Sequence, residues 1–298
     1  MLRRVRHAAR DRVLRAVQDA LRPELGALAT ELAAVHARLD LLEDRLRERV
    51  DATGTGLHEH LTGWERRNRR DVLTAADWDA IRTSAEFFRS ELTHATAHFA
   101  PHDTLRAALR RAPADGLFLE FGVASGSTLR VITEEAPAGR VFGFDSFEGL
   151  PEHWRSGFGV GAFAAEQLPD VPGAELVVGL FDATLPGFLA AHEEPVAFLH
   201  VDADLYSSTR TVLDALAPRM VPGTVVVFDE YFNFPGWQDH EHRAWTEFVA
   251  RTGLEFEHLG FTADDEQVSV RLLSAPVLPP RTEIDTFGTG RTVLPVDA

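Results

Sequence analysis

Four acidic residues stand in two short segments of the sequence, and carboxylates held close together can bind a cation or move a proton. Asp202 and Asp204 belong to the run Val-Asp-Ala-Asp-Leu-Tyr, and Asp229 and Glu230 are consecutive. Each pair follows a short apolar run. Carboxylates at adjacent positions repel one another unless they are protonated, hydrogen-bonded or bridged by a cation. Ligand sets made only of oxygen favour magnesium or calcium over zinc.

A cation at these acids would acidify a bound hydroxyl group and fix it for attack, while a carboxylate or a nearby histidine takes the proton. His240 is the candidate catalytic histidine; His240 and His242 are two residues apart, so on one helix they diverge and cannot share a metal ion. The alternative for both is the start of a surface helix. Asp204 or Asp229 could equally cap the helix that follows.

A glycine turn follows another apolar run, in the segment Glu-Phe-Gly-Val-Ala-Ser-Gly at 120–126. Gly122 and Gly126 allow a tight turn and close approach of a ligand, but the three-glycine pattern of dinucleotide sites is missing. An acid before the turn suits a cationic amine better than a phosphate. Asp145 follows the next run, where an acid accepts both hydroxyls of a ribose. The alternative for the glycines is a structural role in the turn. The alternative for Asp145 is that it accepts hydrogen bonds in a turn or caps a helix.

These features favour a nucleoside ligand without a phosphate requirement, and S-adenosylmethionine fits. The residues assigned to this cofactor are Glu120, Gly122, Ser125, Gly126, Ser127, Asp145, Ser146, Phe181, Asp182 and Asp204. The glycine-rich and aromatic loop 149–163 is a candidate lid over the cofactor or the acceptor.

The elements that must position these residues are short, continuously apolar runs alternating with helical stretches. The runs are 116–121, 140–144, 175–180, 196–201 and 224–228, and the helical stretches include 127–135 and 207–217. Such runs are typical of parallel strands buried on both faces. Two later runs, 255–259 and 267–272, have no helix between them and predict a hairpin. The sequence therefore predicts an α/β fold, a doubly wound Rossmann-like sheet with a C-terminal antiparallel hairpin, whose ligands bind at the carboxyl ends of the strands.

The N-terminal part predicts a helical, coiled-coil segment. Apolar residues recur at alternating intervals of three and four between Leu25 and Leu46, and Pro23 suits the first turn of that helix. Arg38 and Glu43 fall where parallel chains would join opposite charges. We expect a homo-oligomer formed through these helices. The alternatives are an amphipathic helix lying on its own domain and a peripheral contact of the arginine-rich start with a membrane.

The predicted organisation has four parts. Residues 1–50 form the N-terminal helices, and residues 51–115 form a linker and a helical cap in which aromatic residues from Trp78 to Phe99 dock onto the core. Residues 116–273 form the cofactor-binding domain. Residues 274–298 are a proline-rich surface tail.

Composition excludes several classes of protein. The 298 residues contain no cysteine, which rules out disulfides, thiolate zinc sites and a cysteine nucleophile. The net charge is -16, divided into +4 over residues 1–70 and -20 over the remainder, and so argues against nucleic acid as a partner. The sequence has no apolar run long enough for a transmembrane helix and no apolar core of a secretory signal at its start. We therefore expect a cytoplasmic protein with a small-molecule partner.

Four motifs together resemble the class I S-adenosylmethionine-dependent methyltransferases, and within them the macrocin O-methyltransferase family. The motifs are Glu-Phe-Gly-Val-Ala-Ser-Gly at 120–126, Phe-Asp-Ser-Phe-Glu-Gly-Leu-Pro at 144–151, Val-Asp-Ala-Asp-Leu-Tyr-Ser-Ser-Thr at 201–209 and Asp-Glu-Tyr at 229–231. The resemblance covers about residues 117–273. It implies that Asp202, Asp229 and Glu230 hold Mg²⁺ and that Asp202 is also the base. It further implies transfer of a methyl group to a sugar hydroxyl in natural-product biosynthesis.

The expected function is thus an S-adenosylmethionine-dependent O-methyltransferase acting on a small glycosylated or polyhydroxylated acceptor. Two alternatives remain open at this point. One is a nicotinamide-dependent oxidoreductase on the same fold, and the other is a non-catalytic nucleoside-binding protein that serves oligomerisation.

Overall fold

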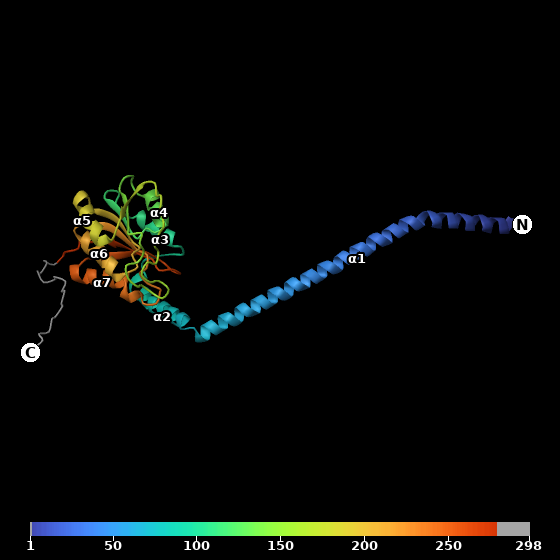
Figure 1. Cartoon of the computed structure of the whole chain (residues 1–298), viewed down its shortest axis with the longest axis horizontal. Coiled ribbons are helices and arrows are strands. Elements are labelled where there is room, and N and C mark those ends of the chain that lie inside the picture. Colours follow the sequence, from blue (N-terminus) through green and yellow to red (C-terminus); the bar gives the residue numbers. More distant parts are fainter. Residues whose placement is uncertain (1, 279–298) are drawn as a thin grey trace, which may run out of the picture. The chain divides into compact units, whose positions relative to one another are not determined.

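The computed structural model describes residues 2–278, and the chain divides into two compact units between Val72 and Leu73. The first unit is one helix, α1 (Leu2–Arg70), labelled in Figure 1. Pro23 lies inside it, so the predicted helix start at Pro23 is wrong. A proline inside a helix removes one hydrogen bond and strains the preceding turn, but the Ala, Leu and Arg residues on both sides are strong helix formers and α1 continues through it.

The helix also runs through residues 51–70, where the sequence predicts the start of a linker. Gly54 and Gly56 lie in this stretch, and each glycine costs a helix only about 1 kcal/mol relative to alanine. Two glycines in a long helix are therefore a weak stop signal, and α1 ends only at Arg70.

The second unit begins at Leu73 within α2 (Val72–Phe87), which continues into the π-helical segment η1 (Phe88–Leu92). The predicted helical spacing up to Phe99 is not maintained, because a π-helical turn holds extra residues and changes which side chains share a face. Trp78 and Phe99 are exposed, so the expected docking by these two residues is wrong. Phe87 and Leu92 pack against the core instead.

The sheet of the second unit has eight strands in the order β1-β7-β8-β6-β5-β2-β3-β4. The strands are β1 (Thr96–His98), β2 (Leu117–Phe121), β3 (Val141–Asp145), β4 (Ala174–Val178), β5 (Val196–Val201), β6 (Met220–Phe228), β7 (Phe256–Thr262) and β8 (Val268–Leu272). Strands β2 to β6 pair in parallel, and β8 pairs antiparallel with both β6 and β7. The predicted α/β fold with a C-terminal antiparallel hairpin is confirmed. The short strand β1, parallel to β7, is an addition that the sequence does not predict.

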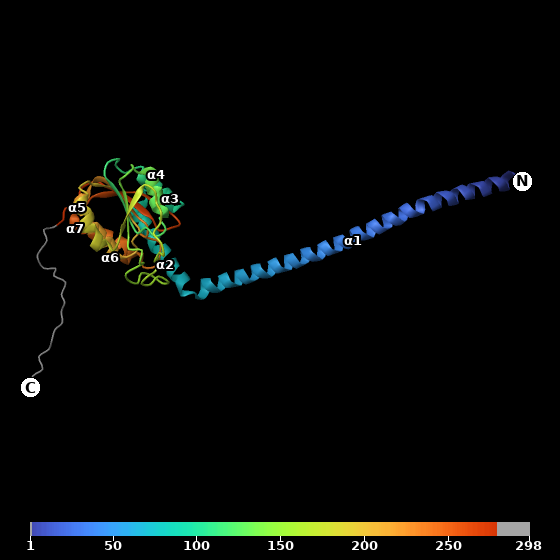
Figure 2. The same cartoon turned by 45° about the horizontal axis from the view of Figure 1, so that its top comes forward.

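Helices cover both faces of this sheet (Figures 1 and 2). The helices are α3 (Pro101–Leu109), α4 (Ser127–Glu135), α5 (Phe181–Ala191), α6 (Tyr206–Leu216) and α7 (Glu241–Thr252), with short turns η2 (Ala217–Arg219) and η3 (Trp237–Asp239). Neighbouring strand residues point to opposite faces: Phe118 packs with α3 and α4, whereas Leu119 packs with α5, α6 and α7. All residues of β2 and β5 are buried, as their mainly apolar runs predict, and the burial includes Glu120 and His200.

None of the helices in the described part of the chain is both long and apolar enough to cross a membrane. Residues 279–298 of the predicted tail lie outside the described residues.

Candidate active site

A pocket of about 530 Å³ lies at the carboxyl ends of the parallel strands. Its lining takes one or more residues from each of five strand ends: Gly122 after β2, Asp145 at the end of β3, Gly179 after β4, Asp202 after β5 and Asp229 after β6. A doubly wound sheet binds ligands at this edge, and the volume falls in the range of small-molecule sites.

The structure brings part of the predicted cofactor set to this pocket. The lining residues from that set are Gly122, Asp145, Ser146, Phe181, Asp182 and Asp204. The others, which do not line the pocket, are Glu120, Ser125, Gly126 and Ser127. Gly126 faces the loop before β4 instead: a Cβ atom placed on it would lie 2.6 Å from the side chain of Val171 in that loop.

Gly122 is the point at which two strand ends touch. Its φ is +93°, and a Cβ atom on it would lie only 1.7 Å from the carbonyl oxygen of Asp202. Only glycine fits this contact without moving the backbone. The close approach fixes the turn after β2 against the segment that carries the acids after β5.

Asp145 holds the glycine turn. Its Oδ2 atom accepts hydrogen bonds from the backbone N–H groups of Val123 and Ala124 at 2.8 and 2.9 Å, and its Oδ1 atom accepts one from Phe147 at 2.7 Å. The turn role that the sequence leaves open for Asp145 is therefore present. Asp145 also lines the pocket, so the ribose role remains a prediction.

Glu120 lies beneath the pocket in a buried chain of three charged residues. Its carboxylate is 2.9 Å from Nδ1 of His200, and Nε2 of His200 is 3.3 Å from the carboxylate of Asp229. Burial alone would lower the pKa of His200, but these two carboxylates raise it well above its usual value. Burial would raise the pKa of Asp229, yet the contact with His200 lowers it. Burial also raises the pKa of Glu120 although His200 opposes the shift, so a proton is held within this pair between two strands.

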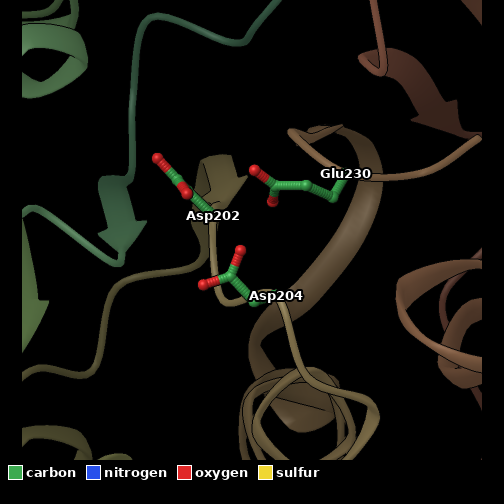
Figure 3. A group of neighbouring side chains, drawn as sticks. All are labelled: Asp202, Asp204 and Glu230. Carbon is green, nitrogen blue, oxygen red and sulfur yellow. The ribbon is translucent and has the colours of Figure 1, made fainter. Parts of the chain in front are cut away.

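A group of three carboxylates faces the pocket beside this chain, and it differs from the predicted metal set. Asp202, Asp204 and Glu230 each place a carboxylate oxygen within 4.8 Å of the others (Figure 3). Asp229 is not in the group, because its side chain turns to His200. Asp204 replaces it, placed by a left-handed backbone conformation with φ +59°.

Burial and mutual repulsion dominate the electrostatics of this group. Burial first, and then the charge of Asp229, raise the pKa of Asp202 well above its usual value. Burial and the charge of Asp202 do the same for Glu230, whose buried Oε2 atom faces no hydrogen-bond donor among the described residues. Burial raises the pKa of Asp204 to about 7 although Arg155 opposes the shift. Such a group can hold a proton or a cation near neutral pH.

Glu241 positions both acidic segments, and sequence reasoning missed it. The fully buried side chain accepts hydrogen bonds from the backbone N–H of Ala203 at 3.3 Å and from that of Glu230 at 3.1 Å. It stands in the first turn of α7, next to the histidines singled out from the sequence. Acidic residues are common in the first turn of a helix, so the sequence does not mark Glu241 as special. Only the fold shows that its side chain reaches two strand ends.

The predicted lid contributes Gly149, Leu150, Pro151 and Phe163 to the pocket lining. Arg155 anchors the middle of this loop. Its guanidinium lies 3.9 Å from the ring centre of Trp154 and 4.7 Å from that of Phe234, and it donates to both carboxylate oxygens of Glu266 at 3.0 Å. The loop is thereby tied to the turn between β7 and β8.

His240 does not line the pocket. It directly precedes α7, half-buried, with its ring centre 6.1 Å from that of Phe234. The two tyrosines do not line the pocket either: Tyr231 is buried against aromatic rings, and the Tyr206 hydroxyl donates to Glu247. Tyr231 follows Glu230 and Tyr206 stands two residues after Asp204, but neither side chain points into the pocket.

Part of the chain is similar to known proteins. Residues 119–231 match the family model described as a methyltransferase domain, and this match covers β2 through the acidic pair after β6. The predicted resemblance to class I S-adenosylmethionine-dependent methyltransferases is confirmed.

A curated relative is the 8-demethyl-8-(2,3-dimethoxy-alpha-L-rhamnosyl)-tetracenomycin-C 4'-O-methyltransferase of Streptomyces olivaceus. It is 31% identical over 159 residues, which are 43% of this chain and 59% of the relative. This chain thus matches less than two thirds of the length of that relative. Solved structures that are similar include a calicheamicin methyltransferase, 25% identical with a TM-score of 0.46 over 57% of this chain and 76% of the other. The O-methyltransferase NovP is 23% identical with a TM-score of 0.44 over 57% and 78%.

Proposed function

We propose that this protein is an S-adenosylmethionine-dependent O-methyltransferase that acts on a hydroxyl group of a small glycosylated acceptor. The observation that carries the proposal is the arrangement of one pocket, which joins Asp145 and Phe181 at one side to the three carboxylates at the other. A cofactor and a hydroxyl-bearing acceptor could then lie end to end. The relative that acts on a rhamnosyl tetracenomycin supports a sugar hydroxyl as the acceptor.

The cofactor would lie against the glycine turn, with Asp145 and Ser146 near its ribose and Phe181 and Asp182 near its base. S-adenosylmethionine supplies an electrophilic methyl group when bound. Gly122 fits this placement, because the site admits no side chain there and the backbone itself forms the wall. Glu120 would act indirectly, by holding His200 beneath the pocket floor.

Asp202 would be the base. Its carboxylate lines the pocket beside Asp204 and Glu230, where it could accept a proton from an acceptor hydroxyl. His240, the second catalytic candidate, stands before α7 beside Phe234 and Arg155 and could contact a larger acceptor at the edge of the lid.

A divalent cation such as Mg²⁺ would be held by Asp202, Asp204 and Glu230 instead of by Asp202, Asp229 and Glu230. The residues fit such an ion, because three acids with raised pKa values face one another and Glu230 Oε2 has no donor among the described residues. The ion would orient the acceptor hydroxyl and favour loss of its proton. We further propose that the chain forms a homo-oligomer through α1.

Titration calorimetry with S-adenosylmethionine tests the cofactor, and mass spectrometry of candidate sugar-bearing acceptors incubated with the protein and cofactor tests methyl transfer. We expect binding heat, and a loss of affinity of about tenfold in Asp182→Ala, which removes a lining residue. Glu148→Gln, on an exposed side chain outside the pocket lining, is the matched control. No binding heat together with an unchanged melting temperature would overturn the proposal.

The cation is tested separately. Metal-free protein titrated with MgCl₂ should bind one ion per chain, and a chelator should reduce methyl transfer. Activity that resists the chelator, together with no Mg²⁺ binding, would overturn the cation and leave the methyltransferase proposal standing.

A further inference from the structure

The apolar stripe of α1 has no partner within its own unit. Eight residues at coiled-coil spacing are at least 46% exposed: Leu21, Leu25, Leu28, Leu32, Val35, Leu39, Leu42 and Leu46. An unbroken row of exposed aliphatic residues over seven helical turns is unstable in water unless another surface covers it. We call this row the α1 stripe.

The residues that flank the α1 stripe carry charge in an ordered way. On one side the flanking positions hold Glu24 and Glu31 in the first half and Arg38 and Arg45 in the second half. Ion pairs within α1 join Asp19 to Arg22, Glu43 to Arg47 and Glu65 to Arg69. In the described part of α1, none of the four flanking residues takes part in an ion pair.

We propose that the α1 stripe is covered by α1 of a second copy of this chain, and that the two helices run antiparallel. This inference rests on the proposed oligomerisation and adds its orientation and register. Leu28 of one copy faces Leu39 of the other, and Leu32 faces Val35. With Leu25 opposite Leu42 and Leu21 opposite Leu46, every layer of the contact is apolar.

The charges select this arrangement. In antiparallel helices, flanking residues on the same side face one another, so Glu24 meets Arg45 and Glu31 meets Arg38 of the second copy. On the opposite side Arg22 meets Glu43. Twofold symmetry forms each of these three opposite-charge contacts twice.

A parallel pair uses the same leucines but fewer charges. There Arg38 faces Glu43, as the sequence suggests, while Glu24 faces Ala29 and Arg45 faces Val50. The charge pattern therefore favours the antiparallel pair over the parallel one expected from Arg38 and Glu43 alone.

The register is selected in the same way. Sliding the antiparallel helices by seven residues in either direction sets Glu31 against Glu31 or Arg38 against Arg38. Like charges directly opposite one another weaken pairing. The two exposed in-helix ion pairs that involve Arg22 and Glu43 are of the weak surface kind and can be exchanged for contacts between copies.

Sedimentation equilibrium of the full chain measures whether the pair exists. We expect a dimer at micromolar concentration. A monomer at all concentrations would overturn both the pairing and its orientation, and pelleting of that monomer with phosphatidylglycerol vesicles would assign the stripe to a membrane surface. Binding of S-adenosylmethionine is measured on the same sample, so failure of the pairing and failure of the proposed enzyme are distinguishable.

Disulfide cross-linking measures the orientation, and the absence of cysteine from the chain makes single-cysteine variants unambiguous. A mixture of Leu28→Cys and Leu39→Cys, re-equilibrated and oxidised, should give a mixed dimer that mass spectrometry identifies. Each variant alone should stay uncrosslinked. Efficient cross-linking of Leu39→Cys with itself, without the mixed dimer, would establish a parallel pair and overturn the antiparallel orientation.

Charge exchange gives an independent measurement. Glu31→Arg and Arg38→Glu should each raise the dimer dissociation constant by about tenfold, because each replaces two attractive contacts by two repulsive ones. The double variant Glu31→Arg/Arg38→Glu should restore it. In a parallel pair the double variant would keep Glu43 opposite an acid and stay weak, which would overturn the proposal. Glu48→Arg, an equal charge change away from the stripe, is the control, and circular dichroism checks helix content.

Discussion

Two sets of acids lie at the same end of the pocket. The first set forms ion pairs with a histidine, and the second set has no such partner among the described residues. Glu120 and Asp229 share His200, which lies 2.9 and 3.3 Å from them; His200 and Glu120 are buried, and Asp229 is partly buried. Asp202 and Glu230, which belong to the second set, form no ion pair with a basic residue of the described chain, although a few residues separate them from the first. The same residue type is therefore used in two opposite electrostatic conditions.

The difference separates structural from functional acids. A buried ion pair with good contacts fixes the strands it joins, here β2, β5 and the end of β6, and breaking it leaves an uncompensated charge. Buried acids without a counter-ion cost folding free energy, and a fold retains them where a ligand supplies the missing partner. On this view Asp229 belongs to the scaffold, and Asp202, Asp204 and Glu230 belong to the reaction.

The largest expected effect is on the rate of Asp202→Asn. Because this change removes the proposed base and one cation ligand, methyl transfer to the identified acceptor should fall by about a thousandfold, equivalent to about 4 kcal/mol. Affinity for S-adenosylmethionine, measured by calorimetry, should change by less than about threefold. A variant that keeps a tenth or more of the rate would remove Asp202 from the reaction.

The paired set should respond in stability. His200→Leu leaves Glu120 and Asp229 buried without their cation, so the free energy of unfolding in urea should fall by about 3 kcal/mol. His200→Gln, which can still donate a hydrogen bond, should lose less. Equal stability of His200→Leu and the unmutated protein would show that the pair is not a structural element.

A second histidine, His242, shows how burial shifts the pKa of a histidine that has no carboxylate beside its ring in the described part of the chain. His242 packs against Phe87, Tyr231 and Trp237 with ring centres 5.5, 5.0 and 4.6 Å away, and burial, helped by His258, lowers its pKa to about 4. Between pH 6.5 and pH 4 the unfolded chain binds a proton at His242 and the folded chain does not. The contribution of His242 to stability therefore falls as pH falls through this window.

The shift corresponds to about 2 kcal/mol lost at pH 5 relative to pH 7. His242→Phe should remove the His242 contribution to the pH dependence of the unfolding free energy, measured from urea unfolding curves, whereas the control His153→Phe, on an exposed side chain, should keep it. Nuclear magnetic resonance titration would add that His242 protonates near pH 4 while His200 stays protonated. An unchanged slope in His242→Phe would contradict the prediction.

The sequence predicts the framework of the site because unbroken apolar runs mark parallel strands and their ends must meet at one edge. Asp145, Asp202 and Glu230 follow such runs, and all three line the pocket. The same runs do not predict whether Asp204 or Asp229 joins Asp202 and Glu230 in the group of three carboxylates. The direction in which an acid on a turn points is set by the backbone dihedral angles of that turn. The left-handed conformation of Asp204 and the partner of Asp229 are properties of the folded chain.

Long-range contacts explain what the sequence does not predict. Glu241 reaches two strand ends through backbone hydrogen bonds, although it is 38 residues from Ala203 in the chain. Gly126 looks equivalent to Gly122 in the turn motif, yet it faces Val171 on a distant loop and not the pocket. In α1 the coiled-coil spacing is visible in the sequence, but Pro23 indicates a helix start that the strong helix formers around it override.

The smallest expected effect is also the sharpest test of the comparison, because it reverses the usual sign of a mutation in a buried site. In metal-free protein, Glu230→Gln removes a buried acid whose pKa is raised by burial and by Asp202, so the variant should be more stable at pH 7.5 by about 1 kcal/mol. For a domain of this size that corresponds to a rise in melting temperature of about 2–4 °C. Added MgCl₂ should stabilise the unmutated protein more than the variant and reduce the difference. If Glu230→Gln destabilises the metal-free protein, then Glu230 belongs with Asp229 in the scaffold, and the division between the two sets of acids is drawn in the wrong place.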